Sequence, residues 1–402
     1  MKSLETIFKE ADKNSFELGA DLDSQQAKSE YDYHINMQAD KALVQSVPVE
    51  FKLGDGSLPP SRFFADISST RLECFFRQGS AERLVVFFSG ARSRNGGCDV
   101  VPYPTFSSWS WYVNTSASVL CIDDPMYFTY PDLTVGWFYG TDTQDYREPT
   151  AMLICEIARL LKVDNSDIVL YGRSSGGSAA VAVGSLIPES SVVAINPQLD
   201  IEKYKYKGKF VSVTGINPSS GDFKARNDFA SMIKSNPKNT FLIISNIASD
   251  FDYDVDLKYL TNNFDLKLKY GVSECNNLFL WQYYACGEID AHGAFENPAL
   301  FSMILTVLEC IKNSADNETV NALASFANSY WADRYELLSR KREINQKAVS
   351  RRLEIERLTA ELNDKNKQLA EKDKKIAALQ KAANSTFLSK IKRAVKKIFK
   401  IK

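Results

Sequence analysis

Residues 167–186 read DIVLYGRSSGGSAAVAVGSL, and this stretch decides the fold. An apolar run predicts a buried strand, and a small-residue pattern beyond it predicts a helix. Between the two stands the motif Gly-x-Ser-x-Gly at 172–176. At a strand-to-helix turn this motif is typical of a nucleophile elbow, in which the central residue is strained and projects above the sheet. We therefore predict Ser174 as the nucleophile, with Gly172 and Gly176 giving strand and helix room to approach.

A glycine-rich turn with an incidental serine is the alternative interpretation of this motif. A phosphate-binding loop is disfavoured, because no Lys-Ser/Thr pair follows the glycines and no GxGxxG is present.

Runs rich in Val, Ile and Phe alternate with helical segments from residue 47 to residue 313. Such alternation predicts a mostly parallel sheet covered by helices on both faces, an α/β fold. The early pair of strands within 47–76 has no helix between its members and predicts an antiparallel start. Strands are expected at 71–76, 83–90, 118–125, 167–172, 190–197, 240–246 and 277–286, and helices at 145–163, 176–187, 220–234, 253–263 and 296–313.

A serine hydroxyl needs a base, and the chain has two histidines. His34 lies in the polar N-terminal segment, whereas His292 follows the last predicted strand, where this fold would place its base. An acid that orients the imidazole should lie between Ser174 and His292 in the chain. The segment after the strand 240–246 offers Asp250 as first choice and Asp252 as second.

Other acids fit this role less well. Asp254 and Asp256 are expected at the start of the next helix, where acids favour the helix dipole. Asp290 is too close to the histidine in sequence, and Asp200 follows a different strand.

An oxyanion needs two N–H donors. We expect one from Ser175, the residue after the nucleophile. The other is expected in the loop FSGARSR, from Ala91 with Gly90 as its neighbour. Arg92 and Arg94 either meet an anionic substrate or are simply solvated.

The chain resembles the α/β-hydrolase superfamily over about residues 47–313. The resemblance is carried by GRSSG at 172–176, SDFD at 249–252 and DAHG at 290–293, in Ser–Asp–His order. It implies an eight-stranded, mostly parallel sheet and acyl-transfer chemistry with no cofactor or metal.

In that chemistry Ser174 attacks an ester, His292 carries the proton and Asp250 orients His292. The architecture is also similar to bacterial enzymes of surface glycans, some of which are O-acetyltransferases that take acetyl from acetyl-CoA. Esterase and O-acetyltransferase, acting on a glycan or a small ester, therefore stay open. The alternative from a different class is an inactive hydrolase-fold scaffold, tethered to a membrane by its tail.

The sequence divides into four expected parts: a polar segment 1–46, the catalytic domain 47–313, a long helix or coiled coil 314–383, and a basic amphipathic helix 384–402. Two interleaved seven-residue series within 337–379 have the spacing of heptad core positions, and basic residues fill about half of one series. Self-association through this helix is one outcome that the pattern allows.

The last eighteen residues, 385–402, place apolar side chains on one helical face and contain seven Lys or Arg and no acid. This pattern favours an anionic membrane surface as partner over a solvated tail. A formal net charge of −1 gives no reason to expect nucleic acid as a partner. Seven scattered cysteines and an N-terminus without an apolar signal region predict a cytoplasmic protein. The basic tail adds the expectation that it is peripheral on the inner membrane face.

Overall fold

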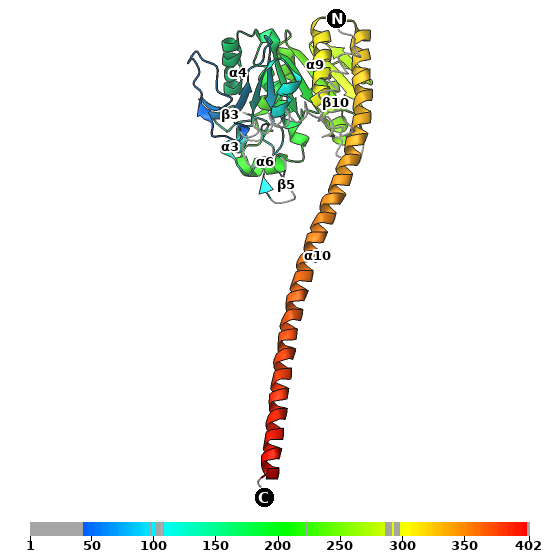
Figure 1. The fold of residues 1–402 in the computed structure, drawn as a ribbon. Coiled ribbons are helices and arrows are strands. Elements are labelled where there is room, and N and C mark those ends of the chain that lie inside the picture. The colour runs from blue at the N-terminus through cyan, green and yellow to red at the C-terminus, as the bar shows by residue number, and fades with distance from the viewer. Residues whose placement is uncertain are drawn as a thin grey trace. The chain divides into compact units, whose positions relative to one another are not determined.

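The computed structural model describes residues 43–92, 94–95, 99–100, 106, 108–221, 223–285, 292 and 298–399. In this part of the chain, ten strands form one sheet in the order β1-β2-β3-β7-β4-β8-β9-β10-β12-β11, and a separate two-stranded hairpin lies within 94–100 (Figure 1). The strands of the large sheet are β1 (Val49–Glu50), β2 (Arg62–Ile67), β3 (Thr70–Arg77), β4 (Leu84–Phe88), β7 (Ser118–Ile122), β8 (Ile168–Arg173), β9 (Ser191–Ile195), β10 (Thr240–Asn246), β11 (Gly271–Cys275) and β12 (Leu278–Tyr283); those of the hairpin are β5 (Arg94–Asn95) and β6 (Asp99–Val100).

Six neighbouring strands, from β7 to β12 in the sheet order, run parallel, whereas β2, β3 and β11 pair antiparallel to a neighbour. The helices are α3 (Met126–Thr129), α4 (Arg147–Leu161), α5 (Ser175–Gly184), α6 (Lys207–Thr214), α7 (Phe229–Ser235), α8 (Lys258–Asn263), α9 (Pro298–Lys312) and α10 (Asn317–Phe399). Short 3₁₀ helices are η1 (Trp109–Asn114), η2 (Asn165–Asp167), η3 (Ile201–Lys203) and η4 (Lys224–Asn227), and η5 (Asp252–Leu257) is a π-helix.

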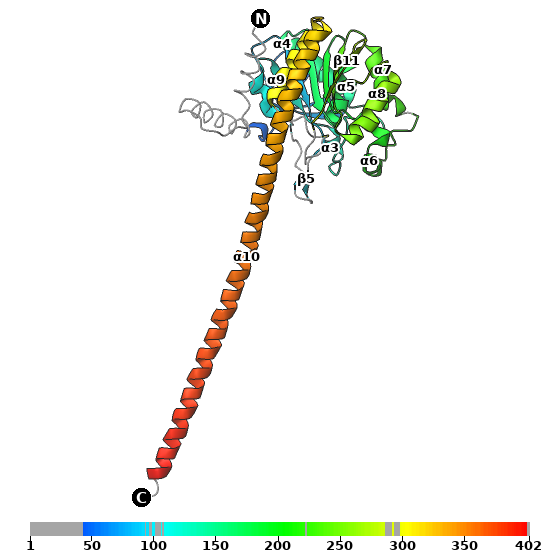
Figure 2. The same ribbon diagram turned by 90° about the vertical axis from the view of Figure 1, so that its right-hand side faces the viewer.

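Two hydrophobic cores lie on opposite faces of this sheet. Along β4, the side chains of Leu84, Val86 and Phe88 enter one core, while Val85 and Phe87 enter the other, as strand alternation requires. Helices α4, α5, α7 and α8 cover the first core, and α9 with the first turns of α10 covers the second (Figures 1 and 2). All five β4 side chains are buried, which explains the unbroken apolar run in the sequence.

The expected α/β fold with a mostly parallel sheet is confirmed. All seven expected strands form, and the antiparallel start is the β2–β3 pair. The expectation of eight strands is exceeded by two edge strands. One is the two-residue β1, and the other is β11, which pairs antiparallel with β12. Neither was predicted, because GVSEC is only half apolar and β1 is too short to show a pattern.

The chain divides into two compact units, residues 1–336 and residues 337–402. The expected end of the catalytic domain at residue 313 falls in the turn between α9 and α10. The first unit runs further because Val320, Leu323 and Ala324 of α10 are buried in the second core.

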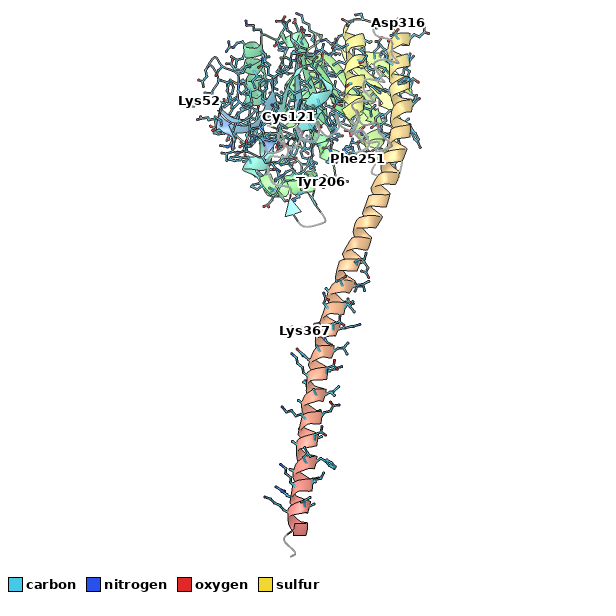
Figure 3. The ribbon with its side chains drawn as sticks, viewed as in Figure 1. Lys52, Cys121, Tyr206, Phe251, Asp316 and Lys367 are labelled. Carbon is cyan, nitrogen blue, oxygen red and sulfur yellow. The ribbon has the colours of Figure 1, made fainter. Side chains whose placement is uncertain are left out.

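The second unit consists of the rest of α10. Its described side chains are exposed, and they include apolar residues at spacings of three, four and seven: Ile355, Leu358, Leu362, Leu369, Ile376 and Leu379 (Figure 3). Among the described residues, none of the helices combines the length and apolarity that crossing a membrane needs.

Candidate active site

The predicted elbow is present at the carboxyl end of β8, where Ser174 lies between the strand and α5. Ser174 has φ 52° and ψ −126°, an unfavourable backbone conformation for a residue with a side chain. A Cβ on Gly172 would lie 2.0 Å from the carbonyl oxygen of Gly176, and one on Gly176 would lie 2.5 Å from that of Phe88. Both glycines are therefore required by the close approach of backbone to backbone.

Ser174, His292 and Asp252 form a continuous hydrogen-bonded chain. Ser174 Oγ lies 2.8 Å from His292 Nε2. On the other side of the ring, His292 Nδ1 lies 2.7 and 3.0 Å from the two carboxylate oxygens of Asp252. A carboxylate at Nδ1 fixes the tautomer in which Nδ1 carries the proton, so Nε2 is left to accept the serine proton.

The first choice for the acid, Asp250, is wrong as a partner of His292, and the second choice, Asp252, occupies that position. Asp252 is fully buried, whereas Asp250 is exposed. The two residues stand in a helical turn, where positions two apart point to nearly opposite sides. Once Asp252 faces the imidazole, Asp250 must face solvent.

The other acids that were weighed lie elsewhere. Asp254 is exposed and pairs with Lys258 at 2.6 Å, and Asp200 pairs with Lys203 at 2.8 Å. Asp290 lies outside the described residues, as does His34.

Asp256 lies in η5, directly before α8, as expected for the start of this helix, but its side chain is buried. Its Oδ1 accepts a hydrogen bond from the backbone N–H of Leu199 at 2.6 Å. Burial raises the pKa of Asp256 well above its usual value, and the charge of Asp252 raises it further. Burial therefore favours the protonated form of Asp256, under the segment that follows β9.

Two buried asparagines tie the loops of the site to the sheet. Asn196, after β9, donates from Nδ2 to the carbonyl oxygen of His292 at 2.7 Å. Its Oδ1 accepts the N–H of Asn246 at 2.9 Å, and Asn246 in turn bonds both backbone groups of Ala285. Sequence reasoning missed both residues. The available signal was an asparagine at the end of each of two apolar strands. A buried amide in such a place needs hydrogen-bond partners, so it indicates that a loop is fastened there.

Two further side chains reach the hydroxyl of Ser174, and neither was predicted. Gln198 donates from Nε2 to Ser174 Oγ at 2.8 Å. Tyr204 lies near the same serine. Burial raises the pKa of Tyr204, while its interaction with the side chain of Ser174 acts in the opposite direction. Both residues lie in the segment after β9, so the serine has neighbours from two segments, this one and the one that carries His292.

The oxyanion donors were predicted as Ser175 and Ala91, with Gly90 beside them. Ser175 is the first residue of α5, where a backbone N–H has no acceptor within the helix. A Cβ on Gly90 would lie 3.1 Å from the carbonyl oxygen of Arg173, so the loop after β4 lies against the elbow. Ala91 is exposed one residue further on. Donation by these N–H groups stays a prediction.

Of the two arginines in this loop, Arg92 is buried and donates to the carbonyl oxygen of Pro131 at 3.2 Å, which gives it a structural contact. The side chain of Arg94 lies outside the described residues.

The loop after β7 brings aromatic side chains to the site. Asp124 holds both ends of this loop, accepting the N–H of Met126 at 3.0 Å and that of Phe138 at 3.1 Å. Burial raises the pKa of Asp124 to about 7. The indole of Trp137 packs edge-on against Tyr204, with ring centres 5.9 Å apart.

Tyr204 also contacts the rings of the half-buried Phe251, at 5.1 Å, and the exposed Tyr206, at 5.6 Å between ring centres. An aromatic surface thus continues from the serine outward.

No family model matches the chain, and no curated protein matches its sequence. Similar solved structures include the capsule O-acetyltransferase of Neisseria meningitidis serogroup A, at 17% identity and a TM-score of 0.44, covering 63% of this chain and 98% of that one. An S-formylglutathione hydrolase from Agrobacterium tumefaciens is 17% identical with a TM-score of 0.37, covering 56% and 86% of the two chains. An esterase of Thermogutta terrifontis is 15% identical with a TM-score of 0.39, covering 63% and 94%.

Proposed function

We propose that the protein is a serine-dependent acyl-ester enzyme that works through an acyl-enzyme on Ser174. The single observation that carries this proposal is the unbroken chain of hydrogen bonds from Ser174 through His292 to Asp252, all at 3.0 Å or less. An inactive scaffold of the same fold would have no need for a strained serine, a histidine and a buried carboxylate in this order.

In the acylation step, Ser174 Oγ attacks the carbonyl carbon of the ester while His292 Nε2 takes the hydroxyl proton. Asp252 holds the ring and stabilises the imidazolium that forms. In this proposal the N–H groups of Ser175 and of the loop after β4 donate to the oxyanion. His292 then returns the proton to the leaving atom, which is the ester oxygen or, with acetyl-CoA as donor, the thiol sulfur, and the acyl group remains on the serine.

The second step decides between two activities. Water would release the acid, which makes the protein an esterase. A sugar hydroxyl would receive the acyl group, which makes it an O-acetyltransferase with acetyl-CoA as donor. Both acceptors use the same acyl-enzyme, so both remain candidates within one mechanism, and a glycan or small ester is the proposed substrate class.

The acyl-enzyme can be tested by mass. Purified protein is mixed with p-nitrophenyl acetate, quenched in acid and digested. We expect one acetyl group on the peptide that contains Ser174, and none on that peptide in Ser174→Ala. Loss of the adduct when acetyl-CoA replaces the ester would favour the esterase. Absence of an adduct in the wild type under every condition would overturn the proposal in favour of the scaffold.

We propose further that the end of α10 binds an anionic membrane surface. Phe387, Leu388, Ile391 and Val395 share one face of the helix and are between 42% and 64% exposed. Exposed basic residues surround them: Lys390, Lys392, Arg393, Lys396 and Lys397. Each such cation near an anionic surface contributes about 1 kcal/mol. The charge selects lipid with anionic headgroups as the occupant of this face.

Pairing of the helix with a second copy stays a prediction. The exposed apolar series from Ile355 to Leu379 supports it, while Lys365 and Lys372 interrupt that series. Light scattering of the purified protein gives the answer: twice the chain mass supports pairing, and the mass of one chain contradicts it.

A further inference from the structure

The hydroxyl oxygen of Ser174 has a second nitrogen neighbour at the same distance as its base. His292 Nε2 and Gln198 Nε2 each lie 2.8 Å from Oγ. When Ser174 gives its proton to His292, its oxygen has lone pairs that accept a hydrogen bond from the amide of Gln198. The geometry therefore places a fixed donor on the atom that performs the attack.

The orientation of the Gln198 amide is determined by Trp137. The indole Nε1–H can only donate, and it lies 2.5 Å from Gln198 Oε1. This contact assigns the oxygen end of the amide to Trp137 and the NH₂ end to Ser174. Gln198 and Trp137 are 1% and 2% exposed, so water does not compete for either group.

The backbone around Gln198 is held as firmly as its side chain. Its N–H donates to Ser178 Oγ at 2.9 Å, and that hydroxyl donates to the carbonyl oxygen of Gln198 at 2.7 Å. The next residue, Leu199, is bonded to the buried carboxyl of Asp256. Ser178 belongs to α5, the helix that begins at the elbow. Gln198 is thus fastened to the same helix as the nucleophile.

Placing the indole of Trp137 carries a conformational cost. Trp137 and Phe138 have φ values of 57° and 53°, in the left-handed region that bulky residues avoid. Such residues cost about 1–3 kcal/mol each and persist where the surroundings impose them. The hydrogen bond from the N–H of Phe138 to Asp124 Oδ2 is one such constraint. A strained segment that ends on the partner of Gln198 points to a role at the site.

We propose that Gln198 is a catalytic residue, oriented by Trp137 as a positioning residue. The Nε2–H of Gln198 stabilises the negative charge that develops on Oγ as the proton moves to His292. This charge passes to the carbonyl oxygen as the bond from Oγ to the acyl carbon forms. In deacylation the same bond breaks, and the amide stabilises Oγ as it leaves and recovers its proton from His292. This role rests on the proposed acyl-enzyme function.

The test compares Gln198→Leu and Gln198→Glu with the wild type in the rate of the p-nitrophenyl acetate burst. Gln198→Leu removes the donor. We expect this rate to fall by about 10- to 100-fold, because that is the effect of losing one hydrogen bond to a charged atom. Gln198→Glu keeps the shape. Its carboxylate cannot donate, but its protonated form can, and burial raises its pKa.

The activity of Gln198→Glu relative to wild type should therefore rise as the pH falls from 8 to 6. Trp137→Phe keeps an aromatic ring but removes the indole N–H, so the Gln198 amide can turn. We therefore expect a smaller loss in the burst rate, of about 3- to 10-fold. The matched control is Gln282→Leu, because Gln282 is also buried but caps the N–H of Lys269 at 2.8 Å, outside the site. Melting temperatures of all variants show whether they fold.

The outcomes separate the two proposals. No burst in the wild type would overturn both the acyl-enzyme and the role of Gln198. A wild-type burst with unchanged rates in folded Gln198 variants would overturn only the role of Gln198. If the activity of Gln198→Glu relative to wild type does not rise as the pH falls, donation is overturned, because protonation restores the donor while the shape stays the same. If both Gln198 variants fail to fold, Trp137→Phe decides, and an unchanged rate there overturns the proposal.

Discussion

Asp252 and His292 are forty residues apart in the chain and are joined by hydrogen bonds of 2.7 and 3.0 Å between carboxylate and Nδ1. Because the carboxylate fixes the tautomer of His292, Asp252→Asn should lower kcat for a soluble ester by about 10⁴-fold with little change in KM. Steady-state kinetics on p-nitrophenyl acetate measures this effect.

The matched control for that variant is Asp250→Asn, two residues away and exposed. It should keep kcat within about twofold of wild type, as surface substitutions do. Equal loss in both variants, or loss in Asp250→Asn alone, would contradict the assignment of Asp252 as the orienting acid.

The elbow glycines should tolerate no side chain. In Gly176→Ala, the new Cβ would meet the carbonyl oxygen of Phe88 at 2.5 Å, and backbone atoms cannot turn away as a side chain would. We expect the free energy of unfolding to fall by about 3 kcal/mol, measured by urea denaturation. The clash outweighs the gain of up to about 1 kcal/mol that alanine brings to a helix.

Gly208→Ala provides the comparison, since Gly208 is an exposed residue of α6 with open space around it. This variant should be as stable as wild type or more stable by up to about 1 kcal/mol. A Gly176→Ala protein as stable as Gly208→Ala would show that the close approach at the elbow does not exist.

The buried acid Asp256 should make stability depend on pH. Its pKa is raised in the folded state, so the folded protein holds a proton that the unfolded chain releases above pH 4. The contribution of Asp256 to the free energy of unfolding is then greatest below that pH. It falls by about 1.4 kcal/mol per pH unit as the pH rises toward the folded-state pKa. Asp256→Asn keeps an acceptor for Leu199 and removes this loss. The melting temperature of Asp256→Asn, relative to that of wild type, should therefore increase steadily from pH 5 to pH 8.

Asp254→Asn is the control for this series, because Asp254 is exposed and its partner is Lys258 on the surface. The difference in melting temperature between this variant and wild type should not change with pH in the same way. A constant difference for Asp256→Asn across the range would contradict the raised pKa of Asp256.

The tail should bind membranes independently of catalysis. Full-length protein is expected to float with vesicles that contain phosphatidylserine and to remain behind with pure phosphatidylcholine, and binding should weaken in high salt. Removal of residues 385–402 should abolish flotation and leave hydrolysis of a soluble ester unchanged. Replacing Phe387 and Ile391 with serine tests the apolar face separately and should weaken binding without altering its salt dependence. Flotation of the truncated protein would contradict this proposal.

Much of the fold could be predicted because its strands are buried on both faces. Strands such as LVVFF in β4 then read as unbroken apolar runs, and the elbow requires glycines at fixed positions. The histidine was predictable by elimination, since the other histidine lies in a polar segment. What these features share is that burial or backbone contact leaves few residue types possible.

The rest of the site depends on which way side chains turn. The sequence pattern fits Asp250 and Asp252 equally well. Only the direction in which each side chain points from the helical turn after β10 decides which one faces His292. In the sequence Gln198 is an ordinary polar loop residue. Its orientation becomes clear only in the structure, where the indole N–H of Trp137, sixty-one residues earlier, donates to its amide oxygen. Contacts between distant loops of this kind leave no periodic pattern in a sequence.

The central claim is that Ser174 is an activated nucleophile. The measurement that tests it most directly is labelling of the purified protein with a fluorophosphonate probe, followed by peptide mapping of wild type and Ser174→Ala. The account predicts one modified residue in the wild type, Ser174, with labelling strongly slowed in Asp252→Asn and absent in Ser174→Ala. Label on another residue, or no label on folded wild-type protein, would contradict it.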